Sequence, residues 1–312
     1  MVDDGVWTIA ITARTPTSNL RGNCTFLLVV DTVSPSIWFE SSPDKYSNER
    51  EPLFVWNASD DLSGIDHYVF LVNGSLLNKT LPAKNNSLSF RVNTTALYNI
   101  TIWAYDRAGN NASISKEIYF DYVSPDIFIE EPHRDSNCRH YINEDGVLVE
   151  VSWNCSDNLN ISTILVIIDK NGEISVVPLS PYEREYYVSI SGEGAYNVTI
   201  MAIDIAGNSN SDYVLIIADF TPPIIQDVSP TNLSAINRPT FEVTFVAVDM
   251  LSGINHTSVY VDNIFVGRIY NRSFGGIPVD LDYLNRSIEG THNITIQIVD
   301  NAGNIASRTI VF

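Results

Sequence analysis

Aspartate and asparagine recur at fixed places along this chain, and they are the residues whose type and spacing could do chemistry. Asp106, Asp204 and Asp300 each open the motif Asp-x-Ala-Gly-Asn. Carboxylate, amide and backbone oxygens are the ligands that Ca²⁺ prefers, with about six to eight around one ion. Asp and Asn are also ordinary turn residues, because they hydrogen-bond their own backbone, and Gly supplies positive φ. The motif therefore fits either a calcium ligand or a structural turn.

Known catalytic motifs are absent from the sequence. It has no nucleophile elbow, no His-Glu-x-x-His, no phosphate-binding loop and no dinucleotide glycine pattern. The five histidines do not cluster, and no sequence spacing would reveal a glycosidase-like pair of carboxylates. We therefore expect a protein that is not an enzyme and has no catalytic residue.

The charge balance argues against several classes of partner. Of the 312 residues, 18 are Lys or Arg and 37 are Asp or Glu, and the net charge of −19 disfavours nucleic acid and anionic membranes. The hydrophobic fraction of 45% is high enough to build cores. No run of 18 uncharged apolar residues occurs, and residues 1–13 do not resemble a signal peptide. We expect no membrane-spanning segment in this chain, and any secretion signal or anchor to lie outside it.

Three landmarks recur in the same order and indicate repeated modules. Asp-x-x-x-Pro begins at Asp31, Asp121 and Asp219, at intervals of 90 and 98 residues. A strand-like run that ends in Asp comes early in each period, and Asp-x-Ala-Gly-Asn comes late. The sequence predicts three homologous modules, at residues 31–120, 121–218 and 219–312.

Residues 1–30 are predicted to be a partial module, because they contain only two strand-like runs, equivalent to the last hairpin of the others. The turn that joins these runs lacks Asp-x-Ala-Gly-Asn. Either the chain was cut from a longer array, or the hairpin completes a sheet in another copy by strand addition. The module at 219–312 has all its strands, so we favour the first explanation.

Alternation of apolar and polar residues indicates β-strands throughout the chain. Val149, Val151 and Trp153 alternate with Glu150 and Ser152, and no sustained period near 3.6 residues occurs. β-Branched and aromatic residues fill such runs, and Gly, Asn, Asp and Pro separate them. Short strands in modules of this size predict an all-β fold of tandem antiparallel β-sandwiches.

Taken with these strands, the motifs resemble those of a known family. Tyr98-x-Ile-x-Ile-x-Ala-x-Asp106-x-Ala-Gly-Asn, then a strand and Asp-x-x-x-Pro, is similar to tandem extracellular immunoglobulin-like and fibronectin type III-like repeats. Such repeats occur in bacterial and archaeal surface proteins of the S-layer or adhesin type. The resemblance implies tyrosine corners at Tyr98 and Tyr196, whereas His292 breaks the pattern in the third module. It implies a fold and not one function, because such modules serve as spacers, adhesins, coat proteins and enzyme appendages.

In an immunoglobulin-like sandwich, the loops after the second strand and before the last strand lie at one pole with the module's first residues. This pole would gather aspartates from three segments of each module, similar to the calcium sites between cadherin repeats. Clustered carboxylates repel one another and so favour a bound cation, although structural turns remain the alternative. Ca²⁺ is the one cofactor that we expect. The candidate ligands are Asp31, Asp60, Asp61 and Asp106, then Asp121, Asp157 and Asp204, and then Asp219, Asp249 and Asp300.

Sixteen Asn-x-Ser/Thr sequons occur in the chain, where chance would give about five. Asn99, Asn197 and Asn293 take equivalent places in the three modules and alternate with inward apolar residues, as a glycan that projects into solvent requires. We expect a heavily N-glycosylated extracellular protein, with an accidental excess in an Asn-rich chain as the alternative. The candidate acceptors are Asn23, Asn57, Asn73, Asn78, Asn85, Asn93, Asn99, Asn111, Asn154, Asn160, Asn197, Asn232, Asn255, Asn271, Asn285 and Asn293.

Three cysteines are too few for a disulfide scaffold, and no Cys/His spacing suits zinc. Cys155 is predicted to face inward in the second strand of the middle module. Cys138 precedes it by 17 residues, on or just after the first strand, which in a sandwich can lie beside the second. We expect a Cys138–Cys155 disulfide, with two buried thiols as the alternative. Cys24 has no local partner.

Together these features predict a non-enzymatic structural segment of a cell-surface glycoprotein, in a surface layer, sheath or extracellular filament. We expect calcium at the acidic poles, N-linked glycans, and self-assembly with identical or related surface subunits. The alternative is an adhesin or stalk, or a spacer appendage of a secreted hydrolase. Ordered lattices or fibres would favour the first, and a soluble monomer that binds a glycan or a partner cell would favour the second.

Overall fold

The chain is built of β-strands. The computed structural model describes residues 2–14, 21–76 and 81–312, and within them it has strands and turns and no helix. The predicted all-β fold class is therefore confirmed. None of these segments forms a helix of the length and hydropathy needed to cross a membrane. The chain divides into two compact units, Met1–Ser124 with Asp204–Asn208, and Pro125–Ile203 with Ser209–Phe312.

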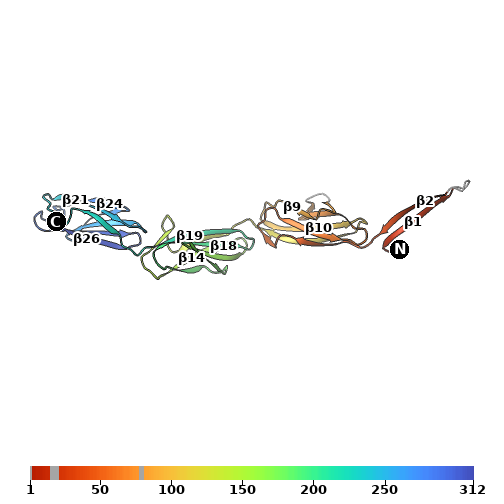
Figure 1. Cartoon of the computed structure of the whole chain (residues 1–312), viewed down its shortest axis with the longest axis horizontal. Helices are drawn as coiled ribbons and strands as arrows, with labels where there is room; N and C mark the ends of the chain where they lie inside the picture. The colour runs from red at the N-terminus through yellow and green to blue at the C-terminus, as the bar shows by residue number, and fades with distance from the viewer. Residues whose placement is uncertain (1, 15–20, 77–80) are drawn as a thin grey trace. The chain divides into compact units, whose positions relative to one another are not determined.

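The first unit begins with a two-stranded antiparallel sheet of β1 (Gly5–Arg14) and β2 (Arg21–Val30), drawn in red in Figure 1. The two strands pair in one continuous register, from Gly5 with Val30 to Arg14 with Arg21. Nearly all of their side chains are exposed, although many of them are apolar.

The rest of the first unit has two sheets. Their strands are β3 (Ser36–Ser41), β4 (Tyr46–Ser47), β5 (Leu53–Ser59), β6 (Ile65–Val72), β7 (Ser75–Leu76), β8 (Leu81–Pro82), β9 (Ser87–Ser89), β10 (Ala96–Asp106) and β11 (Asn111–Phe120). One sheet has the order β3–β5–β9, and the other has the order β4–β11–β10–β6–β7, with β8 on β6. β4 pairs with β11 in parallel, and the remaining pairs are antiparallel.

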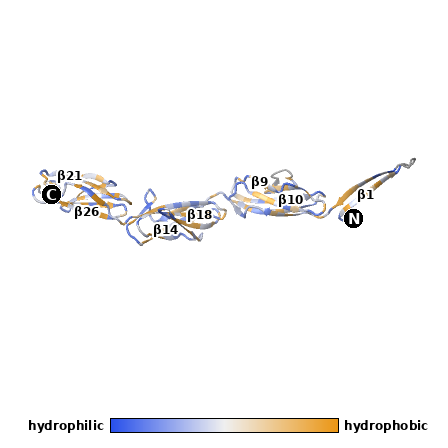
Figure 2. Cartoon of the chain, viewed as in Figure 1, coloured by the Kyte–Doolittle hydropathy of each residue, from blue (hydrophilic) through white to orange (hydrophobic). Residues whose placement is uncertain are grey.

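A single apolar core joins these two sheets. Phe54 and Trp56 of β5 contribute to it from one sheet, and Phe70 of β6 with Ile100 and Ile102 of β10 from the other, all fully buried. Because a strand alternates its side chains between two faces, one face of β10 is apolar and the other polar. Figure 2 shows apolar and polar segments along the same strands. The arrangement is an antiparallel β-sandwich.

The second unit repeats this pattern of a three-stranded sheet against a larger sheet. Its first strands are β12 (Asp126–Glu131), β13 (Arg139–Ile142), β14 (Leu148–Ser156), β15 (Ile161–Lys170), β16 (Glu173–Leu179), β17 (Glu185–Ser189), β18 (Gly194–Asp204) and β19 (Ser209–Ala218). They form the sheets β12–β14–β17 and β13–β19–β18–β15–β16. The core between them includes Val151 and Trp153 of β14, as the alternation predicted, with Ile164 of β15.

The remaining strands of the second unit form a further pair of sheets with a core of their own. They are β20 (Ile224–Ser229), β21 (Thr240–Val248), β22 (Ile254–Val261), β23 (Ile264–Tyr270), β24 (Phe274–Asp280), β25 (Asn293–Asp300) and β26 (Ile305–Val311). The sheet orders are β20–β21–β24 and β23–β22–β25–β26. Val243 and Phe245 of β21 pack in this core with Ile294, Ile296 and Ile298 of β25.

The tyrosine corner predicted at Tyr196 is present. Its hydroxyl donates to the carbonyl oxygens of Ser191 (2.6 Å) and Gly192 (2.9 Å) and accepts from the Ser191 amide (2.9 Å). Tyr98 differs, because its hydroxyl bonds the Thr94 hydroxyl at 2.7 Å. In the third module His292 stands in place of the tyrosine, and its side chain also bonds a backbone carbonyl oxygen upstream.

The link at His292 is made by the imidazole ring. Nε2 lies 2.7 Å from the carbonyl oxygen of Ser287, five residues upstream as in the Tyr196–Ser191 pair. Nδ1 lies 2.8 Å from Oδ2 of Asp262. A side chain with two ring nitrogens can therefore replace the tyrosine hydroxyl and add a carboxylate contact.

The predicted Cys138–Cys155 disulfide is wrong, because all three cysteines are free. Cys155 is buried in β14, whereas Cys138 lies in the turn before β13, with φ of 59°, and its carbonyl oxygen accepts from Leu215 of β19. After β12 the chain crosses to the other sheet, so Cys155 lies in one sheet and Cys138 directly precedes a strand of the other. Burial raises the pKa of the Cys155 thiol, which keeps it protonated. Cys24 is exposed on β2.

Candidate cation-binding carboxylates

The Asp-x-Ala-Gly-Asn motif forms a closed turn between the last two strands of a sandwich. In the first unit, Oδ1 of Asp106 accepts from the amides of Ala108 (2.9 Å) and Asn110 (2.8 Å), and Oδ2 accepts from Nδ2 of Asn110 (2.9 Å). Gly109 has φ of 97°, which residues with a side chain rarely adopt. The structural-turn interpretation of the motif is therefore confirmed.

The same turn holds the first residue of the module. Nδ2 of Asn110 donates to the carbonyl oxygen of Asp31 at 3.1 Å. The Asp31 carboxylate in turn accepts from the amides of Val33 (3.1 Å) and Ser63 (3.0 Å), which places it beside the loop after β5. One aspartate thus joins the entry of the module to two of its loops.

Asp60 closes that loop in a similar way. Its Oδ1 accepts from the amides of Leu62 (3.3 Å), Ser63 (2.9 Å) and Gly64 (2.6 Å). None of these hydrogen bonds uses Oδ2. The loop amides therefore leave Oδ2 of Asp60 available to another ligand.

These turns bring three predicted ligands together in the first unit. Carboxylate oxygens of Asp31, Asp60 and Asp106 all lie within 4.8 Å of one another. Asp31 is 8% exposed and Asp106 is 3% exposed, so two of the three are removed from bulk water. Asp61, which was predicted with them, is outside this group: it is exposed and lines a cavity of about 300 Å³ next to Asp31 and Asp60.

The second unit contains the equivalent group at Asp219, Asp249 and Asp300, again within 4.8 Å. The asparagine of the turn makes the same side-chain hydrogen bonds as Asn110, since Asn304 donates to Oδ2 of Asp300 (2.9 Å) and to the Asp219 carbonyl oxygen (2.7 Å). Further carboxylate contacts come from the amides of Thr221 and Ser252 to Asp219, and of Leu251 and Gly253 to Oδ1 of Asp249.

The predicted ligands of the middle module divide between the two units. In the first unit, Oδ1 of Asp204 accepts from the amides of Ala206 (2.8 Å) and Asn208 (2.9 Å), and Nδ2 of Asn208 donates to the Asp121 carbonyl oxygen (3.1 Å). Asp121 accepts from the Val123 amide at 3.1 Å. In the second unit, Oδ2 of Asp157 accepts from the Leu159 amide at 2.8 Å. The turn chemistry is the same as in the other modules.

The two complete groups differ in their electrostatics. Hydrogen bonding from Ser63 and from the Val33 amide outweighs burial and holds the pKa of Asp31 below its ordinary value of 3.8. Burial raises the pKa of Asp300 above 3.8, against the hydrogen bonds from Asn304, and the charge of Asp219 adds to the increase. Asp300 therefore bears an uncompensated cost of ionisation that a nearby cation would remove.

The oxygens of the second-unit group fit a hard divalent cation. Every potential ligand is a carboxylate, carbonyl or hydroxyl oxygen, which suits Ca²⁺ and not a metal that prefers sulfur or imidazole. Ser252 is 7% exposed, and within the described parts of the chain its hydroxyl has no hydrogen-bond partner. Its amide donates to Oδ2 of Asp219 at 2.9 Å, so this hydroxyl belongs to a residue that contacts the group.

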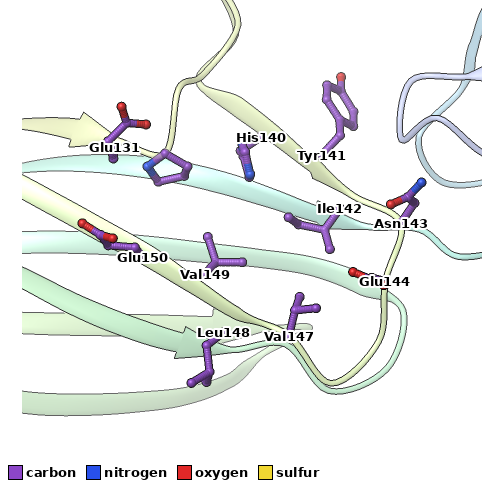
Figure 3. Close-up of a pocket in the computed structure, with 11 residues that line it drawn as sticks. Glu131, His140, Tyr141, Ile142, Asn143, Glu144, Val147, Leu148, Val149 and Glu150 are labelled. Carbon is purple, nitrogen blue, oxygen red and sulfur yellow. The ribbon is translucent and has the colours of Figure 1, made fainter.

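A separate cavity of about 450 Å³ lies in the second unit where β12, β13 and the start of β14 meet. Figure 3 shows Ile142, Val147 and Val149 together in its middle and Tyr141 pointing away. Its polar lining includes His140, whose Nδ1 lies 2.9 Å from the His133 carbonyl oxygen, and the exposed Glu131 and Glu150.

The predicted glycan acceptors occupy the surface. Of the fifteen that lie in the described residues, thirteen are exposed, and Asn57 and Asn255 are half-buried. Asn57 is occupied by other contacts, because its Nδ2 donates to Glu40 (3.1 Å) and its Oδ1 accepts from Ala58 (2.9 Å). Asn78 lies outside the described residues.

No protein family model and no curated protein sequence matches the chain. Similar solved structures include fibronectin(III)-like modules of CbhA from Clostridium thermocellum, at 16% identity and a TM-score of 0.35, covering 59% of this chain and 92% of that one. A Ca²⁺-stabilized adhesin of an Antarctic bacterium has 13% identity and a TM-score of 0.36, with 98% and 80% coverage. A tetra-tandem repeat from the extending region of a large adhesion protein has 14% identity and a TM-score of 0.35, with 99% and 81% coverage.

At these identities and TM-scores the similar structures assign no function to the chain. They are fibronectin type III-like modules and adhesin repeats, which is the class of extracellular repeat that the sequence motifs of this chain resemble.

Proposed function

We propose that this chain is a segment of a non-enzymatic, structural cell-surface glycoprotein that forms part of a surface layer, sheath or extracellular filament. The observation that carries the proposal is the use of the recurring aspartates. Asp106 and Asp300 hold closed turns, and the asparagines of those turns bind the first residue of the module. Carboxylates that fasten a module's entry to its last hairpin serve a mechanical purpose and are not free to act on a substrate.

The role of calcium in the proposal is to neutralise these buried carboxylates. Three carboxylates within 4.8 Å repel one another, and the groups at Asp31 and Asp219 place oxygens from three chain segments around one point. An ion that binds only the folded state stabilises it by mass action, by about 2.7 kcal/mol at a hundred times its dissociation constant. Calcium would then make each module harder to unfold under load.

Thermal unfolding with Ca²⁺ and with excess chelator tests this proposal, and two variants separate the cation from the turn. Asp60→Asn removes a charge but keeps the Oδ1 acceptor that binds the loop amides. Asp61→Asn removes the same charge one residue later, at an exposed side chain outside the group. We expect the calcium-dependent shift of residues 31–120 to disappear in the first variant and to persist in the second. Equal melting with Ca²⁺ and chelator in the unmodified protein would overturn the calcium proposal.

Glycosylation is the part of the proposal that addresses the cell surface. Asn99, Asn197 and Asn293 are exposed on β10, β18 and β25, so a glycan at each would project from a sandwich without disturbing its core. We expect the mass of natively sourced protein to exceed 34.7 kDa and to fall on deglycosylation. Peptide mapping should find Asn57 unoccupied, because its amide nitrogen is already bonded to Glu40. A native mass equal to that of the bare chain would contradict the glycoprotein assignment.

Self-assembly distinguishes a structural layer from an adhesin or spacer. Purified native protein examined by electron microscopy should form ordered sheets or fibres. A soluble monomer that binds a glycan or a partner cell would instead support the adhesin or stalk.

A further inference from the structure

The cavity of about 450 Å³ at β12, β13 and β14 opens onto the apolar core of its sandwich. Val149 belongs to that core, and Ile142 and Val147 are half-buried and pack against it. These three side chains lie together in the middle of the cavity (Figure 3). Leu148, which also lines the cavity, is 65% exposed. The cavity therefore presents apolar surface to a ligand.

The cavity lies where the chain crosses from one sheet of the sandwich to the other. β12 is the outer strand of the sheet β12–β14–β17, and β13, which follows it, is the outer strand of the larger sheet. Among the described strands, β12 pairs only with β14, and β13 pairs only with β19. Both strands therefore have a free edge, and such an edge can accept a further extended chain through main-chain hydrogen bonds.

The charged side chains that line the cavity favour a positively charged ligand. Glu131, Glu144 and Glu150 line it, all three are exposed, and none of the eleven lining residues is lysine or arginine. From Glu130 to Glu150 the chain has six carboxylates and two arginines. One of these arginines, Arg134, is held in an ion pair with β19. A ligand with both aliphatic groups and positive charge would match the apolar floor and the carboxylates together.

A cavity of about 430 Å³ lies at the equivalent place between the last two sheets of the second unit. The strand registers agree, because Glu131 pairs with Ser152 between β12 and β14, and Ser229 pairs with Thr244 between β20 and β21. Each cavity is lined by the first residue of this pair and by the proline that follows it. The two cavities are therefore the same feature of two homologous modules.

The two cavities differ in charge. Where the first has Glu131 the second has Ser229, and where the first has Glu144 the second has Arg238. The second cavity has one lining carboxylate, Glu242, which Arg238 balances. We call the first the acidic cavity and the second the neutral cavity. Because the same fold forms around the neutral cavity, folding does not require the three carboxylates of the acidic cavity.

We infer that the acidic cavity docks an extended segment of a partner protein that carries lysine or arginine at alternate positions. Alternate side chains of an extended chain point the same way, so the basic side chains would share one face. Their methylene stems would cover the apolar floor while their charged ends meet the exposed carboxylates. A second copy of this chain fits poorly, because copies with a net charge of −19 repel one another. This inference requires neither the calcium nor the glycans of the proposed function.

The test uses the full chain, labelled at the methyl groups of isoleucine and valine, and the peptide acetyl-Lys-Val-Lys-Val-Lys-amide as the probe. We expect the NMR signals of Ile142, Val147 and Val149 to shift saturably, and that of Ile236 in the neutral cavity to stay in place. Binding should weaken as the salt concentration rises, because exposed charges are screened. The matched peptide acetyl-Glu-Val-Glu-Val-Glu-amide should cause no shift. No shift with the lysine peptide, or equal shifts at Ile142 and Ile236, would overturn the inference.

Exchange of charge between the two cavities tests the role of the carboxylates. Glu144→Arg gives the acidic cavity the residue that the neutral cavity has, and because Glu144 is exposed the change touches no core. It should weaken binding of the lysine peptide about fivefold, since an exposed attraction becomes a repulsion. Glu183→Arg makes the same change at an exposed residue of the turn between β16 and β17, outside the cavity, and should leave the affinity unchanged.

The reverse exchange should create a site. Ser229→Glu combined with Arg238→Glu gives the neutral cavity three carboxylates, and the signal of Ile236 should then shift with the lysine peptide. Unchanged affinity in the Glu144→Arg variant would contradict the inference. So would a shift of Ile142 that depends on protein concentration without any peptide, because a second copy of the chain would then occupy the acidic cavity.

Discussion

The carboxylate groups at Asp31 and at Asp219 share the hydrogen bonds of their turn asparagine. They differ in the direction in which the pKa of a member carboxyl is shifted. In both, an asparagine side chain links the turn to the first residue of the module, at 3.1 Å and 2.7 Å. Yet the pKa of Asp31 is lowered by hydrogen bonds from Ser63 and Val33, and that of Asp300 is raised by burial. Ser63 bonds Asp60 through its hydroxyl, whereas the Ser252 hydroxyl has no partner within the described residues.

This difference shows that the turn geometry of the motif and the charge state of its carboxylates are set by different contacts. The backbone geometry of Asp-x-Ala-Gly-Asn depends on the amides that donate to the carboxylate, and the amide of the last asparagine donates in both groups. The cost of ionising the carboxylates depends on burial and on neighbouring hydroxyls, which lie outside the motif. We therefore expect the group at Asp219 to gain more from Ca²⁺ than the group at Asp31.

The largest effect should come from removing the turn carboxylate. Asp106→Ala leaves the amides of Ala108 and Asn110 without their acceptor and removes one of the two acceptors of the Asn110 side chain. Hydrogen bonds to charged groups contribute about 1.5–3 kcal/mol each, so the loss of three should lower the free energy of unfolding of residues 31–120 by at least about 4.5 kcal/mol. Asp300→Ala should cost less, because it also removes a carboxylate that burial disfavours. Hydrogen exchange of β10 and β25 after each substitution measures the two losses, and equal losses would show that burial of Asp300 is compensated.

Calcium should produce the next largest effect, and it should be unequal. At saturation we expect Ca²⁺ to stabilise residues 219–312 by about 2–3 kcal/mol and residues 31–120 by less. Asp249→Asn, which keeps the Oδ1 acceptor for its loop, should abolish the larger effect. Exchange rates of β25 and β10 amides with Ca²⁺ and with chelator give both values. A larger response in residues 31–120 would contradict the link between Asp300 and the cation.

The grouping of these aspartates could be predicted from the sequence, because the same aspartates recur at equivalent positions of the repeated modules. One aspartate per segment, repeated three times, located Asp31, Asp60 and Asp106 as neighbours before any loop was placed. Asp61 lies outside the group, because adjacent residues in a turn point in different directions and Asp60 is the one that accepts the loop amides. The composition of the strands likewise indicated which residues of β10 and β14 are buried.

Features that depend on the path between strands could not be predicted. The Cys138–Cys155 disulfide assumed that the chain stays in one sheet after β12, but β13 pairs in parallel with β19 of the other sheet. No periodicity marks such a crossing, because each strand alternates correctly on either sheet. His292 is a similar case, since its bond to Ser287 depends on a turn whose shape the sequence pattern does not specify.

The smallest expected effect is a pH dependence that has opposite signs in the two groups. The folded pKa of Asp300 lies above its ordinary 3.8, so the folded state takes up a proton first as the pH falls. Its contribution to the free energy of unfolding therefore rises from neutral pH down toward pH 3.8. The folded pKa of Asp31 lies below 3.8, so its contribution is present above that pH and is lost only as the pH falls through the lowered value.

Without calcium, acidification from pH 7 to pH 4 should therefore stabilise residues 219–312 relative to residues 31–120. The Asp300→Asn variant isolates this contribution from the other carboxylates, because it removes the titrating group and keeps an oxygen that can accept from the Asn304 amide. The difference in pH dependence between the unmodified chain and the variant, measured by exchange of β25 amides, should be positive toward low pH and should vanish when Ca²⁺ is added. A difference that survives saturating Ca²⁺ would place the cation away from Asp300, and the unsatisfied Ser252 hydroxyl would then need another ligand.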